Sequence, residues 1–385
     1  MTKDDYFIDL ILKKCVNFKN TKSLFIAYNS YNEDFIQKLL AKLDNKVKDI
    51  YLDCKDPFFE HDLLQELSVD EIKNDPYFSD EIYDKYAKKK ASFLIFMSPV
   101  PGLMNDIDDE KLMVAAKRRN ETKTFFAKQE ITYKIPWCIL PLYNSYWEES
   151  LGIDNLQEIL YKVCMIDENV IENWHNLITK NEQMITYLNS LKLEKLHITN
   201  KLGTDIVIGL PKDYLFEGIN SNPVYVNFPS YEIFTSPNYK LTEGIVYNSK
   251  PLLYNGAVID NFYLEFKDGK VVNYHAEKGQ NILKSIIEFD NQSAFLGEVA
   301  LVEANSPINQ TNIIFKSTLL DENASCHLAL GKGFGNGSPA KLKKMGINDS
   351  KIHVDFMIGT DDTKVTGLRG NEEITLMENG LFVQK

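Results

Sequence analysis

The arrangement of apolar residues changes near Leu193, and this change restricts the folds that the chain can adopt. Before it, short apolar runs typical of buried strands, such as 23–29 and 92–99, alternate with segments of helical periodicity, such as 33–43. Strands that alternate with helices predict a parallel sheet within an α/β layer. Residues 170–191 then form a long predicted helix that would connect this half of the chain to the next.

After Leu193, short apolar runs recur between turn residues, which predicts strands joined by hairpins. Residues 224–229 are one such run, and Asp268-Gly269 separates two others with a pair that favours a two-residue hairpin. A chain of 385 residues is long enough for about two domains. We therefore predict an α+β protein with an N-terminal α/β domain at residues 1–192, which includes the connecting helix, and a β-rich C-terminal domain at residues 193–385.

Composition and charge exclude several classes of function. A net charge of −12 with a pI near 5.1 disfavours binding to the phosphate backbone of nucleic acids. The five cysteines are scattered and form no CxxC pair, which disfavours a disulfide framework or a cysteine-based zinc site. Charges interrupt the N-terminal apolar run, and no apolar run approaches the roughly 18 residues that a membrane helix needs. We expect a cytoplasmic protein with no membrane or nucleic-acid partner.

Acids and imidazoles recur in strand-like or loop-like settings of the second half. In the sharpest case, His353 and Asp355 alternate with apolar residues, so both point to one face of a predicted strand. An imidazole beside a carboxylate suits a zinc-like or cobalt-like divalent ion. The full set of candidate ligands is Glu232, Glu298, Glu322, His327, His353 and Asp355.

Each of these residues also has a plain structural interpretation. A single one is more often a capping or surface carboxylate, or a hydrogen-bonded core histidine, than a ligand. For the whole set that interpretation is weaker, because polar groups on apolar-flanked elements need partners when buried. Glu322 and His327 are five residues apart and would not share a face of one helix. Either a helix begins between them, or they would meet different ions.

Longer strings of this half resemble a known family. They are NFPSYEIFTSP, PLLYNGAVI with FKDGKVV, FLGEVALVEANSPI, TLLDENASCHLALG and HVDFMIG, in this order over residues 203–359. The chain thereby resembles the metallo-aminopeptidases of the aminopeptidase S, aminopeptidase T and PepS type. The first half matches only diffusely, through IPWCILPLYNSYWEE.

The resemblance implies a two-metal exopeptidase that removes N-terminal residues from peptides, activated by zinc, cobalt, manganese or magnesium. It also implies a homodimer with an internal cavity, whose β-rich C-terminal domain carries the dimetal site. By position, Glu232 matches a carboxylate of the first metal, and Glu298 matches the carboxylate between the metals, which is also the proposed general base. Further ligands would be Glu322 with His327, and the closing pair His353 with Asp355.

One position departs from the family pattern. The resemblance places a tyrosine, thought to stabilise the developing oxyanion, seven residues after His327, where this chain has Phe334. Loss of one oxyanion donor typically lowers turnover by about 10²–10³. Metal polarisation could suffice, Tyr231 or Lys332 could replace the donor, or the enzyme could be slow or altered. The alternative function is therefore a catalytically weakened, peptidase-like protein that binds metal and peptide.

Other motifs favour less specific interpretations. The glycine-rich run 331–337 is not expected to bind phosphate, because it follows a predicted helix and lacks a GKS or GKT ending. Cys326 beside His327 is expected to be a small core residue rather than a nucleophile, since adjacent helical residues do not face each other. The lysine-rich run 341–344 predicts a solvated turn, or a contact with the C-terminus of a peptide.

Overall fold

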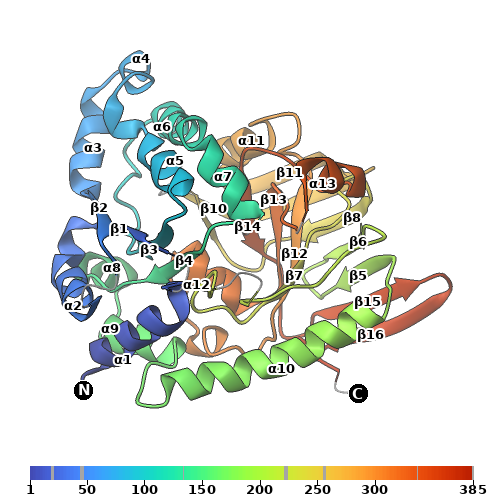
Figure 1. The fold of residues 1–385 in the computed structure, drawn as a ribbon. Coiled ribbons are helices and arrows are strands. Elements are labelled where there is room, and N and C mark those ends of the chain that lie inside the picture. The colour runs from blue at the N-terminus through green and yellow to red at the C-terminus, as the bar shows by residue number, and fades with distance from the viewer. Residues whose placement is uncertain are drawn as a thin grey trace. The chain divides into compact units, whose positions relative to one another are not determined.

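The computed structural model describes residues 1–18, 21–43, 47–132, 134–220, 224–254, 257–335 and 337–383 (Figure 1). The chain divides into two compact units. Unit 1 comprises Met1–Ile178, Ile219–Pro229 and Asn255–Ala257, and unit 2 comprises Thr179–Gly218, Ser230–Tyr254 and Val258–Lys385. After its first segment, the chain therefore contributes two further short segments to unit 1. The domain boundary predicted between residues 192 and 193 stays a prediction.

A parallel sheet forms the centre of unit 1, as the alternation of strands and helices predicted. Its strands are β1 (Ser23–Asn29), β2 (Asp49–Lys55), β3 (Ser92–Met97) and β4 (Trp137–Pro141), in the order β2-β1-β3-β4. All three pairings are parallel. Because parallel strands need crossover connections, helices must lie along the faces of this sheet.

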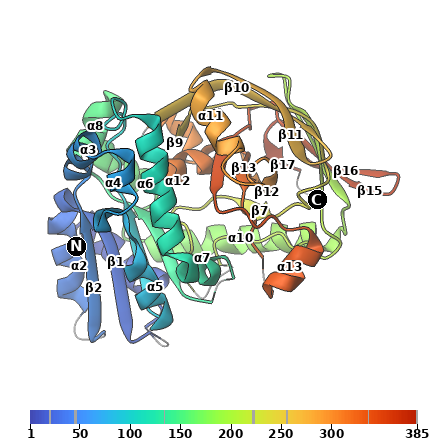
Figure 2. The same cartoon turned by 90° about the horizontal axis from the view of Figure 1, so that it is seen from above.

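Helices precede, connect and follow these strands in the chain. They are α1 (Lys3–Leu10), α2 (Glu33–Leu43), α3 (Pro57–Glu66), α4 (Val69–Ile72), α5 (Glu81–Lys88), α6 (Asp109–Thr122), α7 (Thr124–Ile131), α8 (Ser145–Leu151), α9 (Leu156–Val163) and α10 (Val170–Ser190). Figure 2 shows α2 and α5 on opposite sides of β1 and β2. The helix predicted at 33–43 has the bounds of α2, and the predicted long helix at 170–191 corresponds to α10.

Aromatic side chains fill one interface between the parallel sheet and its helices. The ring of Phe93 lies 5.0 Å from that of Phe25 on β1 and 4.8 Å from that of Phe126 on α7. Tyr83 of α5 completes the group, with its ring 4.5 Å from Phe25. Phe25 and Phe93 are fully buried. This cluster fixes the layer of helices against the sheet through apolar area removed from water.

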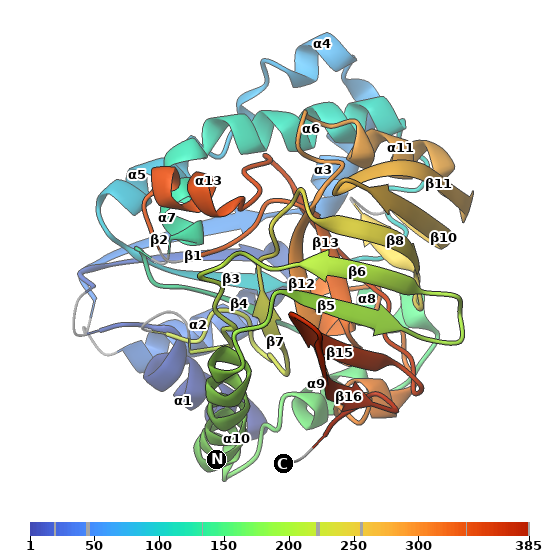
Figure 3. The same cartoon turned by 90° about the vertical axis from the view of Figure 1, so that its right-hand side faces the viewer.

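Unit 2 contains a long antiparallel sheet. Within the described residues it has nine strands, namely β5 (Lys195–Thr199), β6 (Asp205–Gly209), β8 (Thr242–Tyr247), β9 (Leu252–Tyr254), β10 (Ala257–Lys267), β11 (Lys270–Lys278), β15 (Lys364–Arg369), β16 (Glu372–Glu378) and β17 (Leu381–Phe382). Figure 3 shows β5, β6, β8, β10 and β11 side by side. The predicted hairpin is present, since β10 and β11 meet at Asp268-Gly269, both with positive φ.

A second antiparallel sheet of unit 2 packs its apolar face into the same core. It comprises β7 (Ile233–Thr235), β12 (Leu296–Leu301), β13 (His327–Gly331) and β14 (His353–Met357), in the order β14-β13-β12-β7. Short helices α11 (Gln280–Ile287), α12 (Thr318–Asp321) and α13 (Pro339–Met345) lie between its strands in the chain. Alternate residues such as Leu328, Leu330 and Val354 belong to the core cluster shared with strands of the larger sheet.

Three local predictions are wrong. Residues 224–229 form no strand beyond one isolated bridge from Asn227 to Ile139, because their backbone N–H groups bond to loop and helix carbonyls as well. Residues 327–331 form a strand instead of the predicted helix, because burial between β12 and β14 overrides the helical propensity of leucine and alanine. The lysine-rich run 341–344 lies in α13 instead of a turn, and Ser338 caps this helix.

Truncation of a ring in the aromatic cluster tests the packing of unit 1. We expect Phe93→Ala to lower the free energy of unfolding by about 3–5 kcal/mol, through lost burial and the cavity left behind. The control is Phe59→Ala, because Phe59 is 54% exposed and its loss should cost far less. Urea denaturation followed by circular dichroism measures both. Equal losses for the two variants would contradict the assigned core.

Candidate metal centre

The smaller sheet of unit 2 gathers five of the six predicted ligands. Glu232 immediately precedes β7, Glu298 lies in β12, and His327 opens β13. His353 and Asp355 lie in β14, two residues apart, and therefore share a face.

The register of the strands places these side chains on one face. Glu298 pairs with Ala329 of β13, which in turn pairs with Asp355 of β14. Directly opposed residues on neighbouring strands point to the same side, so the row carries an acid at each end. The methyl group of Ala329 lies between the two acids and leaves space above it.

A β-bulge aims Glu298 at this face. Leu296 and Glu298 are two residues apart and would share a side in a regular strand, yet Leu296 belongs to the core. The register with β13 shifts between these two residues, at Gly297, so that Glu298 points to the face opposite to that of Leu296. A Cβ at Gly297 would lie 2.2 Å from the carbonyl oxygen of Lys332, so the bulge needs a glycine.

The imidazoles and carboxylates approach one another closely. His327 Nε2 lies 3.1 Å from Glu232 Oε2 and 3.9 Å from Glu298 Oε1. His353 Nε2 lies 3.0 Å from Asp355 Oδ1 and 3.6 Å from Glu298 Oε2. Glu298 therefore directs one oxygen toward each histidine. Among the described residues, the ion pairs of Glu232, Glu298 and Asp355 all involve these two rings.

These contacts define two groups of ligand atoms, each within 4.8 Å of one another. One group is Glu232, Glu298 and His327, and the other is Glu298, His353 and Asp355. Glu322 belongs to neither group. It is buried in the helical turn Glu322–Ala324, and burial, with the nearby charge of Asp355, raises the pKa of its carboxyl well above the usual range. Glu322 and His327 are therefore not on one helix, since the turn ends before β13 begins.

Both histidines are held from behind by backbone carbonyls. His327 Nδ1 lies 3.2 Å from the carbonyl oxygen of Ser325, and His353 Nδ1 lies 2.7 Å from that of Lys332. A proton on Nδ1 then donates to the carbonyl and leaves Nε2 facing the acids. This is the arrangement by which proteins orient metal-binding histidines.

Burial makes this concentration of acids costly. Burial raises the pKa of Glu298 to about 8, against the opposing charge of His353. Burial lowers the pKa of His327, but the hydrogen bond to Glu232 and the charges of the surrounding acids together outweigh it and raise that pKa to about 9. Burial also lowers the pKa of His353, but Asp355, Glu298 and the carbonyl of Lys332 together outweigh it, so this pKa rises to about 10. The cluster of buried acids therefore favours the binding of additional positive charge, either protons or cations.

The donor set fits divalent cations. Three buried carboxylates and two imidazoles make up the two groups of ligand atoms, and Glu298 is common to both. Imidazole nitrogen with carboxylate oxygen is a zinc-type ligand set, and carboxylates also suit manganese or magnesium. A cation would replace the protons that the histidines otherwise hold, which couples binding to proton release.

Phe334, at the position that the resemblance assigns to a tyrosine, lies beside the cluster. Its ring contacts that of His353 edge-on at 4.8 Å, and its backbone N–H donates to Ser236 Oγ at 2.7 Å. Phenylalanine has no hydroxyl, so this side chain donates no hydrogen bond. Tyr231 and Lys332 remain predicted alternatives for an oxyanion donor.

Two buried residues that the sequence did not single out support the site. The Oδ1 atom of Asn323 accepts a hydrogen bond from the backbone N–H of Tyr231 at 2.6 Å, which anchors the residue before Glu232. Asp321 accepts hydrogen bonds from the backbone N–H groups of Phe315 and Ser317. Burial raises the pKa of Asp321 to about 7. Both residues lie beside Glu322 in the DENASCH string, but only the folded chain reveals their partners.

The glycine-rich run that follows β13 has a different context from the one predicted. It follows a strand and precedes helix α13, while Asn336 lies outside the described residues. The contextual argument against phosphate binding is therefore wrong. The second argument holds, because the run lacks the GKS or GKT ending of a phosphate loop.

Cys326, the other candidate for alternative chemistry, is buried and directs its Sγ to the carbonyl of Val302.

Comparison with known proteins adds independent evidence. A profile of the family described as thermophilic metalloprotease (M29) matches residues 3–382. Aminopeptidase 2 of Geobacillus stearothermophilus is 30% identical over 389 residues, covering 94% of this chain and 93% of that protein. Aminopeptidase AmpS of Bacillus subtilis (strain 168) is 34% identical over 306 residues, 74% of each. The solved structure of wild-type AmpT from Thermus thermophilus matches with a TM-score of 0.87 and 25% identity, covering 99% of each chain.

The charge of the cluster predicts stabilisation by divalent ions. After dialysis against a chelator, added Zn²⁺ or Co²⁺ should raise the melting midpoint. At a free ion concentration of 100 times the dissociation constant, the free energy of unfolding should increase by about 2.7 kcal/mol. Glu298→Ala should lose most of this shift, because Glu298 is in both groups of ligand atoms. The exposed Glu288→Ala is the control and should keep it. Differential scanning fluorimetry measures the shifts, and an undiminished shift in Glu298→Ala would exclude the assigned site.

Proposed function

The chain belongs to the thermophilic metalloprotease (M29) family, and we propose that it is an aminopeptidase with a two-metal centre on the smaller sheet of unit 2. The family makes it a metal-dependent peptide hydrolase, in agreement with the resemblance. The named relatives are aminopeptidases, which supports peptides with a free N-terminus as substrates. The observation that carries the proposal is Glu298, whose two oxygens face the two histidines.

The two groups of ligand atoms suggest how the cations would be held. Glu232 and His327 would hold one, His353 and Asp355 the other, and Glu298 would contact both. Glu322 is proposed as a further ligand, because its buried carboxyl lies within the field of the same acids. When bound, two divalent ions supply Lewis-acid polarisation of the scissile carbonyl and lower the pKa of water.

The residues of the chain supply the proton transfers. The carboxylate of Glu298 would accept the proton of the attacking water and return it to the leaving amine. The carbonyls of Ser325 and Lys332 hold the two imidazoles in place during this step. Burial of the acids keeps bulk water from screening their charges.

The alternative of a catalytically weakened binding protein gains no support from the comparisons, which name aminopeptidases. The identity of the metals, the homodimer and the cytoplasmic location stay predictions. The structure adds one finding on membranes: among the described residues, every helix is too short or too polar to span a bilayer.

Replacement of the shared carboxylate tests the proposed mechanism. Glu298→Gln should abolish release of the N-terminal residue from unblocked peptides in the presence of Zn²⁺ or Co²⁺, while circular dichroism stays that of the parent. Glu288→Gln, the same change at an exposed position, should retain activity. The parent should leave N-acetylated peptides intact. Substantial activity in Glu298→Gln would exclude this residue as bridge and base.

The missing hydroxyl is tested by restoring it. Phe334→Tyr should raise kcat if a donor at this position limits the rate, by up to about 10²–10³. The control is Phe59→Tyr, the same change at a ring that is 54% exposed and lies in unit 1. It should not raise kcat. An unchanged or lower kcat in Phe334→Tyr would show that the rate does not depend on this donor.

A further inference from the structure

Two of the six proposed ligands lie outside the strands of the smaller sheet. Glu232 immediately precedes β7, and Glu322 lies in the helical turn Glu322–Ala324. The other four belong to β12, β13 and β14, where the hydrogen bonds of the sheet fix the backbone that carries each side chain. Other contacts must therefore contribute to the positions of Glu232 and Glu322.

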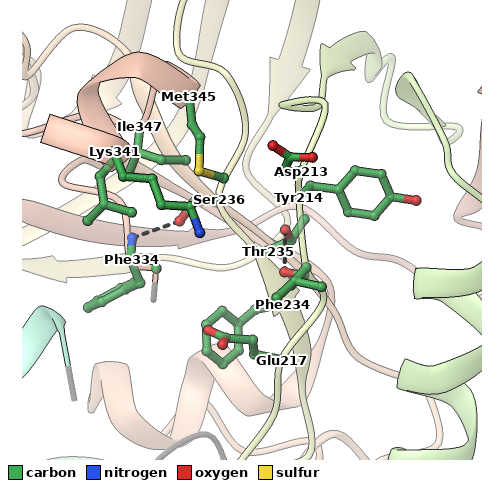
Figure 4. A pocket seen from close by; sticks show the side chains of 13 residues that line it. Asp213, Tyr214, Glu217, Phe234, Thr235, Ser236, Phe334, Lys341, Met345 and Ile347 are labelled. Carbon is green, nitrogen blue, oxygen red and sulfur yellow. Dashed lines mark hydrogen bonds between the residues drawn. The ribbon is translucent and has the colours of Figure 1, made fainter. Parts of the chain in front are cut away.

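The sheet holds the chain after Glu232. Ile233 pairs with Leu301 of β12, which fixes the start of β7. Just beyond the end of β7, the Oγ atom of Ser236 accepts a hydrogen bond from the backbone N–H of Phe334 (Figure 4). These contacts lie on one side of Glu232 along the chain, so they leave the backbone on its other side to be held by a different group.

Asn323 connects the two ligands that lie outside the strands. Its Oδ1 atom accepts a hydrogen bond from the backbone N–H of Tyr231, the residue before Glu232, at 2.6 Å. Its Nδ2 atom donates to the carbonyl oxygen of Leu319 at 3.1 Å and lies 3.5 Å from Glu322 Oε1. One amide group thus contacts both the segment that carries Glu232 and the turn that carries Glu322.

Burial makes the amide of Asn323 difficult to replace. The residue is fully buried, so an apolar side chain in its place would deprive the N–H of Tyr231 and the carbonyl of Leu319 of this partner inside the protein. An amide both accepts and donates hydrogen bonds, and it adds no charge to a cluster in which buried acids already repel one another. These properties suit a residue that positions ligands without being one.

We propose that Asn323 is a positioning residue that holds Glu232 within reach of His327 and thereby sets the cation affinity of this half of the metal centre. The proposal rests on the proposed two-metal function. Glu232 Oε2 lies 3.1 Å from His327 Nε2, so a displacement of the backbone at Tyr231 moves a ligand oxygen directly. Replacement of a residue that orients metal ligands typically lowers metal affinity by about 10–100-fold.

The other half of the centre provides an internal reference. His353 and Asp355 are held by β14, and the carbonyl of Lys332 orients the imidazole of His353. This half therefore has its own supports, which are independent of the hydrogen bond between Asn323 and Tyr231. Loss of the Asn323 amide should weaken one cation site far more than the other.

The experiment measures Co²⁺ binding to the chelator-treated protein by visible absorption of the bound ion. We expect Asn323→Ala to bind one Co²⁺ as the parent does and the second at least 10-fold more weakly. The matched control is Asn144→Ala in unit 1. Asn144 is 4% exposed, and its amide accepts from the N–H of Trp147 at 2.8 Å and donates to the carbonyl of Pro99 at 3.0 Å. This control should lose stability and keep the parent's Co²⁺ binding.

Two histidine backgrounds identify the weakened half. In His353→Ala, which removes a ligand of the other half, Asn323→Ala should lower the affinity of the remaining site at least 10-fold. In His327→Ala, the same change should leave the remaining site nearly unaffected. Asn323→Asp keeps an oxygen that accepts from Tyr231, so it should bind both ions at least as tightly as the parent. If Asn323→Ala does not fold, weakened binding in Asn323→Asp overturns the proposal.

Other outcomes would also contradict the role of Asn323. These are parent-like binding of both ions by Asn323→Ala, an equal loss in Asn144→Ala, and equal losses in the two histidine backgrounds. None of them depends on peptide hydrolysis. A parent that binds two Co²⁺ ions but releases no amino acid would overturn the aminopeptidase function, and the titrations would still decide the role of Asn323. A parent that binds no Co²⁺ would overturn both.

Discussion

Mutual repulsion of buried acids is the constraint on which the site depends. Glu232, Glu298, Glu322 and Asp355 are each at most 9% exposed, and their charges raise the pKa of Glu322 further than burial alone. A fold keeps such a group only if positive charge compensates it. The two imidazoles supply part of that charge. We propose that divalent cations supply the rest, as the metalloprotease family of this chain implies.

The backbone of the sheet creates the required geometry. A bulge at Gly297 reverses the phase of β12, so that Leu296 enters the core while Glu298 points to the opposite face. Ala329 between Glu298 and Asp355 keeps the space above β13 free. Four of the six proposed ligands therefore come from strands, which position side chains more accurately than loops do. On the other face of this sheet, its apolar residues form one continuous core with those of the larger sheet.

The sequence predicted much of this arrangement because its signals are local. Regular alternation predicted the parallel sheet and the shared face of His353 and Asp355, and the family resemblance supplied the remaining candidate ligands. The bulge at Gly297 could not be predicted, since it depends on the close carbonyl of Lys332. The strand at 327–331 was mistaken for a helix because its partners on β12 and β14 are distant in sequence. Asn323 has the same limitation, as its partner Tyr231 precedes it by 92 residues.

The position of Glu298 between the two histidines has a thermodynamic consequence. Its carboxylate cannot reorient toward His327 without changing its distance from His353, so in the proposed two-metal centre occupancy of one half would alter the other. By linkage, the effect is reciprocal: whatever the first cation does to the affinity for the second, the second does to the first. The two halves would therefore load as a coupled pair, and a substitution in either half would be felt throughout the centre.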